Sequence, residues 1–297
     1  MDIKKENSGK LSFGAFETCV SFDLLVASML IFSLVYAGIS GALLDKDSIL
    51  LKVLSYLCAP ISIVLALVFV WCRTKNNPIE LLKVNKIDKV FIPITILLTI
   101  GVMFGLSELN NLLVEFLTKL GFTISEVTLP PKTPLNVCLI IIFVCVVPAV
   151  MEEVFFRGLI INGLYKTGSV FACLTSGLLF SLFHMSPAQT IYQFIVGVIY
   201  ALIVLHGGNY ILTIISHLFN NLFIVLNYYF FNFYPVGELK VVLTILGLIC
   251  LALGLFFVYS NRKEIPALEK KSNFFKSIPF GIIFCVVMWV IGLFSNG

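Results

Sequence analysis

Charged residues are scarce in this sequence. Asp, Glu, Lys and Arg account for 12% of its 297 residues, whereas they make up about 25% of an average soluble domain. A soluble protein needs charge on its surface, while a protein embedded in a membrane exposes apolar side chains to lipid and pairs its backbone polar groups internally. Together with the hydrophobic fraction of 59%, this scarcity excludes a soluble protein. It predicts an all-α polytopic membrane protein, not a soluble domain with one anchor.

Other features are missing as well. The chain has no C-x-x-C motif, so its eight cysteines indicate neither a zinc knuckle nor a disulfide framework, and we expect them to fill space between helices. The net charge of +4 is too small an excess of basic residues to indicate a nucleic-acid partner. The first apolar stretch is too long for a signal peptide, so no cleaved signal is expected.

Apolar segments long enough to span a membrane follow one another along the chain. A membrane-spanning helix needs about 20 mainly apolar residues. Charged residues bound the first such stretches, at 23–45, 52–73, 89–108 and 132–152. The uncharged interval 167–237 is broken by turn-forming residues near Pro187 and Gly207. It therefore divides into 169–185, 189–205 and 210–230, and the last segments follow at 241–260 and 277–295. We expect eight or nine transmembrane helices.

The basic residues predict the orientation of these helices. With a cytoplasmic N-terminus, 15 of the 20 basic residues fall on the cytoplasmic side. They are Lys4, Lys5, Lys10, Arg73, Lys75, Lys83, Lys86, Lys89, Arg157, Lys166, Arg262, Lys263, Lys270, Lys271 and Lys276. Because Lys and Arg concentrate in cytoplasmic loops, we expect a cytoplasmic N-terminus and, with nine spans, a C-terminus on the opposite side.

One long segment between spans, residues 107–133, is expected on that opposite side. Its charged residues alternate with leucines and Phe116 at helical spacing, which predicts an amphipathic helix in the membrane interface. The chain then forms a single membrane domain in three parts. These are the N-terminal spans with the interfacial helix at 1–133, a core of four spans at 134–231, and the C-terminal spans at 232–297.

Ionisable side chains are costly in the membrane interior, so those that remain there are candidates for function. The fourth predicted span carries Glu152, Glu153 and Arg157, and the fifth and seventh carry His184 and His217. One such histidine alone more often bonds a neighbouring helix. Polar groups on several separate spans are much harder to explain by packing.

Helix geometry gives the two glutamates different roles. Glu153 and Arg157 are four residues apart, so they share a helix face and can form an ion pair. Glu152 is turned away by about 100° and has no such partner on its own helix. An unpaired carboxylate in a low-dielectric setting is suited to take a proton from water and to return it later.

His217 and Asn221 are also four residues apart and point to one side of the seventh span. An imidazole and a carboxamide can donate hydrogen bonds to an oxygen that gains negative charge. Asn220 is a rival to Asn221 on a slightly different face. His184 completes the set, either by holding the attacking water with Glu152 or by sharing its proton.

Depth in the membrane supports part of this grouping. Glu152 lies 13 residues before the turn that joins the fourth and fifth spans, and His184 lies 15 residues after it. Both are thus roughly 20 Å from that turn and can face each other. His217 is close to the start of its span, so that helix must begin deeper, or the Gly207-Gly208 connection must dip inward.

At these residues the sequence resembles the CPBP family, also called the Abi family, of CAAX-protease and bacteriocin-processing intramembrane proteases. The resemblance covers about residues 135–230. It rests on three motifs in this order: Glu152-Glu153-x-x-x-Arg157, Phe180-x-x-x-His184 and His217-x-x-x-Asn221.

The resemblance implies endopeptidase activity within the membrane. It makes Glu152 the general base, His184 its partner in activating water, and His217 with Asn221 the oxyanion hole. The remaining motif residues then support the site: Glu153, Arg157 and Phe180. The implied substrate is a membrane-associated peptide or a prenylated protein of the Cys-a-a-X type.

A zinc site is the second chemistry that these residues allow. Glu152, His184 and His217 are suitable ligands, but the chain has no H-E-x-x-H motif. We therefore favour a metal-free glutamate mechanism that needs no cofactor.

Non-enzymatic functions are the alternatives. One is a membrane scaffold or bacteriocin immunity factor that binds a peptide or a membrane partner. Another is a transporter with Glu152 and His184 as a proton relay, which the lack of an internal repeat disfavours. The length and the composition rich in Lys, Asn, Ile and Phe favour a bacterial plasma membrane, where the remaining partners are lipids.

Overall fold

The computed structural model describes residues 13–42, 49–74, 82, 86–123, 129–265, 267–277 and 279–294. This part of the chain is all helical, and seven of its helices are long and apolar enough to cross a membrane. The prediction of an all-α polytopic membrane protein is confirmed. The remaining two predicted spans are helices of 15 residues each. These measure about 22 Å at 1.5 Å per residue, less than a bilayer core of about 30 Å.

The N-terminal part begins with two long helices, α1 (Ala15–Ala42) and α2 (Ile49–Thr74), which pack against each other. The prediction that Asp23 bounds the first span is wrong, because α1 continues on both sides of it. Asp23 Oδ1 accepts a hydrogen bond of 2.7 Å from the backbone N–H of Gly281. Gly281 lies in the first turn of α13 (Phe280–Phe294), where backbone N–H groups have no partner within the helix. The carboxylate is therefore satisfied inside the bundle.

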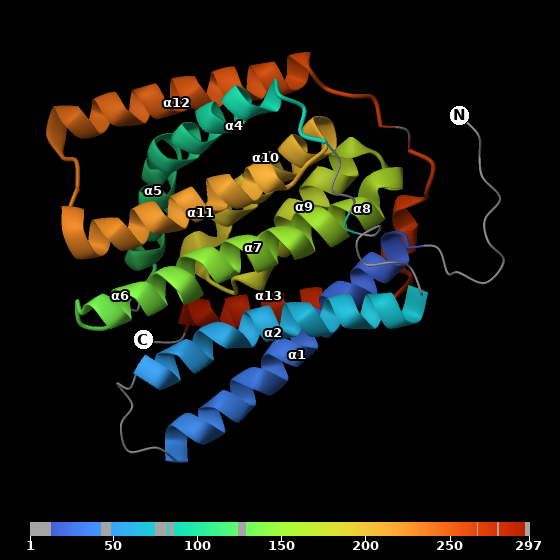
Figure 1. The fold of residues 1–297 in the computed structure, drawn as a ribbon, viewed down its shortest axis with the longest axis horizontal. Coiled ribbons are helices and arrows are strands. Elements are labelled where there is room, and N and C mark those ends of the chain that lie inside the picture. The colour runs from blue at the N-terminus through green and yellow to red at the C-terminus, as the bar shows by residue number, and fades with distance from the viewer. Residues whose placement is uncertain are drawn as a thin grey trace.

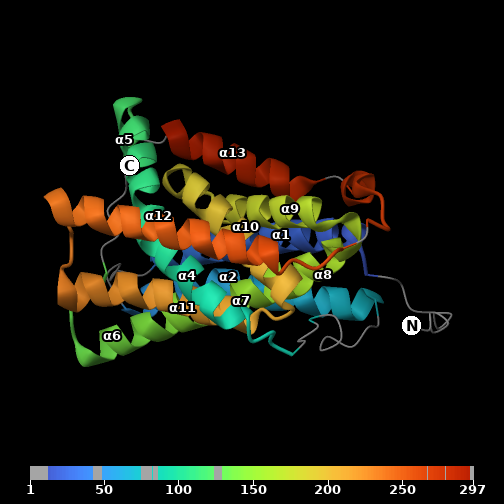
Figure 2. The same ribbon diagram turned by 90° about the horizontal axis from the view of Figure 1, so that it is seen from above.

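The third predicted span is bent. Helix α4 (Phe91–Ile100) passes through the π-helix η1 (Gly101–Gly105) into α5 (Ser107–Lys119). Figures 1 and 2 show α5 turned away from α4 and lying across one end of the bundle. A π-helical turn changes the direction of side chains and often marks a functional region. Leu117 is the buried residue of α5, so this helix is mostly exposed, and its place in the interface stays a prediction.

The fourth span is a continuous helical segment, Pro134–Thr167, that runs through the molecule (Figure 1). The Thr133 hydroxyl caps its start by accepting a hydrogen bond from the Asn136 N–H. Its parts are α6 (Pro134–Ile140), η2 (Ile141–Val146), α7 (Val147–Glu153), η3 (Val154–Ile160), α8 (Ile161–Leu164) and η4 (Tyr165–Thr167). Arg157 lies within η3 and is 1% exposed. Its assignment to a cytoplasmic segment is therefore wrong.

The next two helices, α9 (Ser169–Phe183) and α10 (Thr190–Gly207), form a close antiparallel pair. A side chain at their crossing would have no room, because a Cβ on Gly197 would lie 2.7 Å from the Cα of Gly177. Small residues let helix backbones approach in this way within a membrane. The crossing holds the end of α9, with the second predicted motif, against the rest of the core.

The C-terminal helices also pack against the rest of the molecule, in part through a close approach at glycines. They are α11 (Ile211–Leu226), continued by η6 (Asn227–Phe231), then α12 (Gly237–Ser260), η7 (Lys271–Lys276) and α13. Helix α12 lies on η1 through Gly247, where a Cβ would come within 2.9 Å of the Gly105 Cα. Helix α13 packs on α1 and α9.

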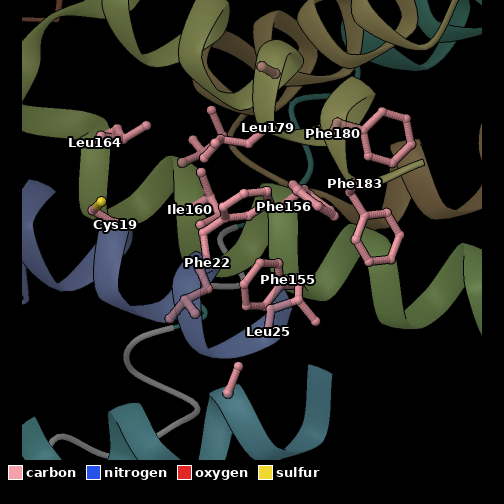
Figure 3. Close-up of a cluster of buried hydrophobic side chains, with 14 of the residues drawn as sticks. Cys19, Phe22, Leu25, Phe155, Phe156, Ile160, Leu164, Leu179, Phe180 and Phe183 are labelled. Atoms are coloured by element: carbon pink, nitrogen blue, oxygen red, sulfur yellow. The ribbon is translucent and has the colours of Figure 1, made fainter. Parts of the chain in front are cut away.

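Aromatic rings fill the space between α1, η3 and α9 (Figure 3). The ring of Phe156 is central. Its centroid lies 5.2, 5.1 and 5.4 Å from those of Phe155, Phe180 and Phe183, each pair in an edge-to-face arrangement. Such pairs stabilise a core beyond the area that they bury. They fix the two helices that carry the first two motifs.

Candidate active site

A buried ion pair lies at the centre of the molecule. Arg157 Nη1 donates to Glu153 Oε1 at 3.0 Å, and both side chains are 0% exposed. Arg157 Nη2 also donates to the carbonyl oxygen of Gly197, at 3.4 Å. The predicted pair is therefore formed, and it links the fourth span to α10. A buried guanidinium such as that of Arg157 requires an opposite charge beside it, which Glu153 supplies.

The third motif contacts the same carboxylate. His217 Nδ1 lies 3.0 Å from Glu153 Oε1, and its Nε2 lies 4.0 Å from Glu152 Oε2. Because a carboxylate paired with a guanidinium accepts hydrogen bonds, Nδ1 carries a proton. Spacing along the sequence indicates His217 as a site residue but does not reveal Glu153 as its partner.

The seventh span begins deep in the bundle, as the position of His217 required. Helix α11 starts after Tyr210, whose ring would lie 3.5 Å from a Cβ on Gly158. Gly158 is a few residues beyond Glu153 on the fourth span, so the turn before α11 lies well inside that span's end. His206 and Asn209 in this turn are 4% and 3% exposed. The turn around Gly207-Gly208 is contacted by Asp88 and Lys263, and an inward connection there, with respect to the membrane, stays a prediction.

Glu152 faces a cavity of about 550 Å³ that also contains His184, His217 and Asn221. The structure thus brings together all four predicted catalytic residues. Glu152 Oε2 is buried and has no hydrogen-bond partner among the described residues. The other lining residues are Met103, Ser107, Asn110, Asn111, Val144, Pro148, Gln189, Tyr192, Gln193, Asn220, Phe223, Ile224 and Val225.

His184 is presented by the end of α9. The helix stops because Met185 has a left-handed backbone (φ 48°) and Pro187 follows, and neither continues a helix readily. His184 Nδ1 lies 2.8 Å from the carbonyl oxygen of Phe180. A carbonyl can only accept, so Nδ1 carries a proton, and in a neutral ring Nε2 is then the acceptor. The neutral ring can therefore hold a water molecule through Nε2.

Phe180 forms the wall behind these groups. Its ring lies 4.9 Å from the ring of His184 and 6.1 Å from that of His217, both edge-to-face. The Arg157 guanidinium carbon lies 4.2 Å from the centre of the same ring, close enough for a cation–π interaction. One side chain thus packs against a residue of each motif, which explains its place in the second motif.

Asn221 is held by a carbonyl of the fourth span. Its Nδ2 donates to the oxygen of Val144 at 3.4 Å. In a regular helix that oxygen would accept from residue 148, but Pro148 has no N–H. A carboxamide nitrogen has a second hydrogen, which can be donated to a group bound in the cavity. The rival Asn220 lines the same cavity, and its Oδ1 accepts from the Tyr192 hydroxyl at 3.2 Å.

Tyr200 is a further residue of the site, which the sequence does not indicate. Its hydroxyl shares a hydrogen bond of 2.8 Å with Ser216, and its ring lies 5.3 Å from the Arg157 guanidinium and 6.3 Å from the His217 ring. It closes the cluster on the α10 side. A tyrosine within an apolar span carries no spacing signal, although its neighbour Ser216 directly precedes His217 in the sequence.

The arrangement of the described residues offers no ready zinc site. They contain no group of three or more His, Cys, Asp and Glu side chains arranged to hold a metal. The contacts of His217 and His184 through Nδ1 do not decide the matter, because metal-bound histidines make the same kind of contact.

One comparison with known proteins gives a match. Residues 134–223 match the family model described as Type II CAAX prenyl endopeptidase Rce1-like. This segment contains all three motifs, and the match confirms the resemblance expected from them. No curated protein and no solved structure matches the chain.

Proposed function

We propose that the Rce1-like segment is the core of an intramembrane glutamic endopeptidase that hydrolyses a peptide bond in a membrane-associated peptide or a prenylated protein of the Cys-a-a-X type. The observation that carries the proposal is the position of Glu152. Its Oε2 is buried in a cavity shared with two histidines and accepts no hydrogen bond from the described residues; His217 Nε2 lies 4.0 Å from it. A polar atom left unsatisfied inside a membrane protein is costly unless a reactant uses it.

Glu152 and His184 activate the water in this mechanism. The carboxylate removes one hydrogen of the water as a proton, and the Nε2 lone pair of His184 accepts a hydrogen bond from the other. The water oxygen then attacks the carbonyl carbon of the substrate. Glu152 later returns the proton to the departing amine, as a general base that becomes a general acid.

His217 and Asn221 stabilise the negative oxygen of the tetrahedral intermediate. Asn221 donates through the second hydrogen of Nδ2, and His217 donates through Nε2. The histidine is then an imidazolium, because Nδ1 is already protonated. With this cation, the charges of Glu152, Glu153, Arg157 and His217 sum to zero. A neutral cluster is what a low-dielectric interior favours.

Glu153, Arg157 and Phe180 position the reacting groups. Glu153 orients His217 by accepting from Nδ1, and Arg157 compensates its charge. Phe180 holds the rings of both histidines. Preorganisation of this kind lowers the energy needed to reach the transition state.

We place the catalytic core at residues 134–231, within a bacterial plasma membrane and with a cytoplasmic N-terminus. Of the basic residues behind this orientation, five lie outside the described residues: Lys4, Lys5, Lys10, Lys75 and Lys83. Apart from the buried arginine, the others cluster at the end of the bundle where α2 and α12 end (Figure 1). The cavity lies in the opposite half, where α10 begins and α11 ends.

Comparative peptidomics tests the function. Membranes that contain the wild-type chain are compared with membranes that contain Glu152→Ala at equal amounts. The proposal expects peptides or shortened proteins that appear only with the wild type. Identical peptide sets would support the non-enzymatic scaffold instead.

A further inference from the structure

Carboxamide side chains line much of the active-site cavity. We call Asn110, Asn111, Gln189, Gln193 and Asn220 the carboxamide mouth; they come from α5, from the 3-10 turn η5 (Pro187–Gln189), from the start of α10 and from α11. The cavity volume of about 550 Å³ falls within the range of about 300–1,000 Å³ for ligand sites.

The carboxamide mouth has hydrogen-bonding capacity to spare. Asn110 Oδ1 is buried and has no partner among the described residues. Asn111 Nδ2 donates to Glu108 Oε1 at 2.9 Å, and Gln193 Nε2 donates to Gln189 Oε1 at 3.4 Å. Each carboxamide offers two hydrogens and an oxygen with two lone pairs, so these bonds leave donors and acceptors unused. The main chain of an extended peptide presents N–H donors and C=O acceptors, and carboxamides can bind both kinds of group.

The cavity has no lysine or arginine among the described residues that line it. Lys240 is paired with Glu108 at 2.7 Å, the carboxylate that also accepts from Asn111. Arg157 lies behind Glu153 with a side chain that is 0% exposed. The cation in the proposed mechanism is His217, which donates to the oxyanion. A substrate carboxylate in the cavity would therefore compete with the oxyanion for His217 and would approach the carboxylate of Glu152.

We propose that the carboxamide mouth binds the main chain of an uncharged, extended segment that continues past the cleaved bond. The C-terminal carboxylate of the substrate then lies outside the cavity. This inference rests on the proposed endopeptidase function and adds the substrate class. The class is an internal, neutral segment of a membrane-associated peptide.

A pair of peptides tests the inference. The probe is an internally quenched neutral peptide with a farnesylated cysteine, made with either a free C-terminal carboxylate or a C-terminal carboxamide a few residues after the cysteine. We expect the purified full chain to cleave the amidated form with a kcat/KM about tenfold higher, because a buried carboxylate would compete with the oxyanion for His217 and approach Glu152. A preference for the free acid would contradict the inference alone. Failure to cleave either form would contradict the proposed function.

Substitutions at the carboxamide mouth give a second test. Gln193→Lys supplies a further cation and should raise the kcat/KM of the free acid relative to the amidated form. Asn111→Leu combined with Gln193→Leu should raise KM for the amidated form about tenfold, because several hydrogen bonds of about 1 kcal/mol are lost, with kcat unchanged. Asn261→Leu, at an exposed site just after α12, is the matched control.

Binding provides a readout that does not depend on cleavage. In a Glu152→Gln chain, the affinity for the amidated peptide should fall when Asn111→Leu and Gln193→Leu are added. An unchanged affinity would contradict the inference, whether or not the peptide is a substrate.

Discussion

Glu153 and His217, which are 64 residues apart in the chain, are joined by a 3.0 Å contact between Oε1 and Nδ1. The same Oε1 accepts from Arg157. One oxygen therefore fixes both the guanidinium and the imidazole. Of the two glutamates, Glu152 lines the cavity, and its Oε2 has no hydrogen-bond partner in the described part of the chain.

Removing the charge of Glu153 should destabilise the folded protein. We expect Glu153→Gln to lower the free energy of unfolding by about 3 kcal/mol or more, because Arg157 is then a buried cation without its counter-charge. Thermal unfolding in detergent measures the change. Glu115→Gln is the matched control, since Glu115 and Lys119 form an ion pair of the same spacing whose side chains are 61% and 72% exposed. It should leave the melting temperature unchanged. Equal effects of the two substitutions would contradict a structural role for the buried pair.

His184→Asn separates the two functions of this histidine. The asparagine amide can keep the hydrogen bond to the Phe180 carbonyl but cannot replace Nε2 in the cavity. We expect kcat to fall by about 10²-fold or more, as for loss of a group that assists proton transfer, at an unchanged melting temperature. Wild-type activity in the His184→Asn variant would contradict a role in water activation and leave His184 only a structural role at the end of α9.

The helices could be predicted from the sequence because charged residues mark where apolar segments end. All nine predicted segments contain helices, yet some limits were wrong for a physical reason. Asp23 lies inside α1 because the start of α13 supplies a hydrogen-bond donor for it. The length of α9 depends on the left-handed Met185, a conformation that residue type alone does not indicate.

Asn221 and Asn220 should differ in the kinetic constant that they change. Asn221→Leu removes a donor to the developing oxyanion and should lower kcat by about 10²-fold. Asn220→Leu removes a group of the carboxamide mouth and should raise KM with little effect on kcat. Steady-state kinetics on the amidated peptide distinguishes them. The reverse pattern would assign the oxyanion hole to Asn220.

Metal removal should not affect hydrolysis. The described residues offer no set of ligands for zinc, so we expect the same rate before and after extensive treatment with a chelator, and no stoichiometric zinc in the purified protein. Elemental analysis beside the activity assay measures both. Loss of zinc and activity together, with recovery of both on adding zinc, would contradict the metal-free mechanism.

The composition of the site was largely predictable, but its internal contacts were not. Spacing of four residues correctly paired Glu153 with Arg157, because both lie on one helix. The contact of Glu153 with His217 depends on how deep α11 begins, and that depth is set by the buried turn before it. Tyr200 was missed for the same reason, since its role arises only when α10 packs against the fourth span.

The cleavage rate of Glu152→Gln tests the central claim most directly. The substitution keeps the shape of the side chain and removes the base, so kcat for the farnesylated peptide should fall by about 10³-fold while the melting temperature stays that of the wild type. Glu115→Gln should retain full activity in the same preparation. Cleavage by Glu152→Gln at the wild-type rate would contradict the account.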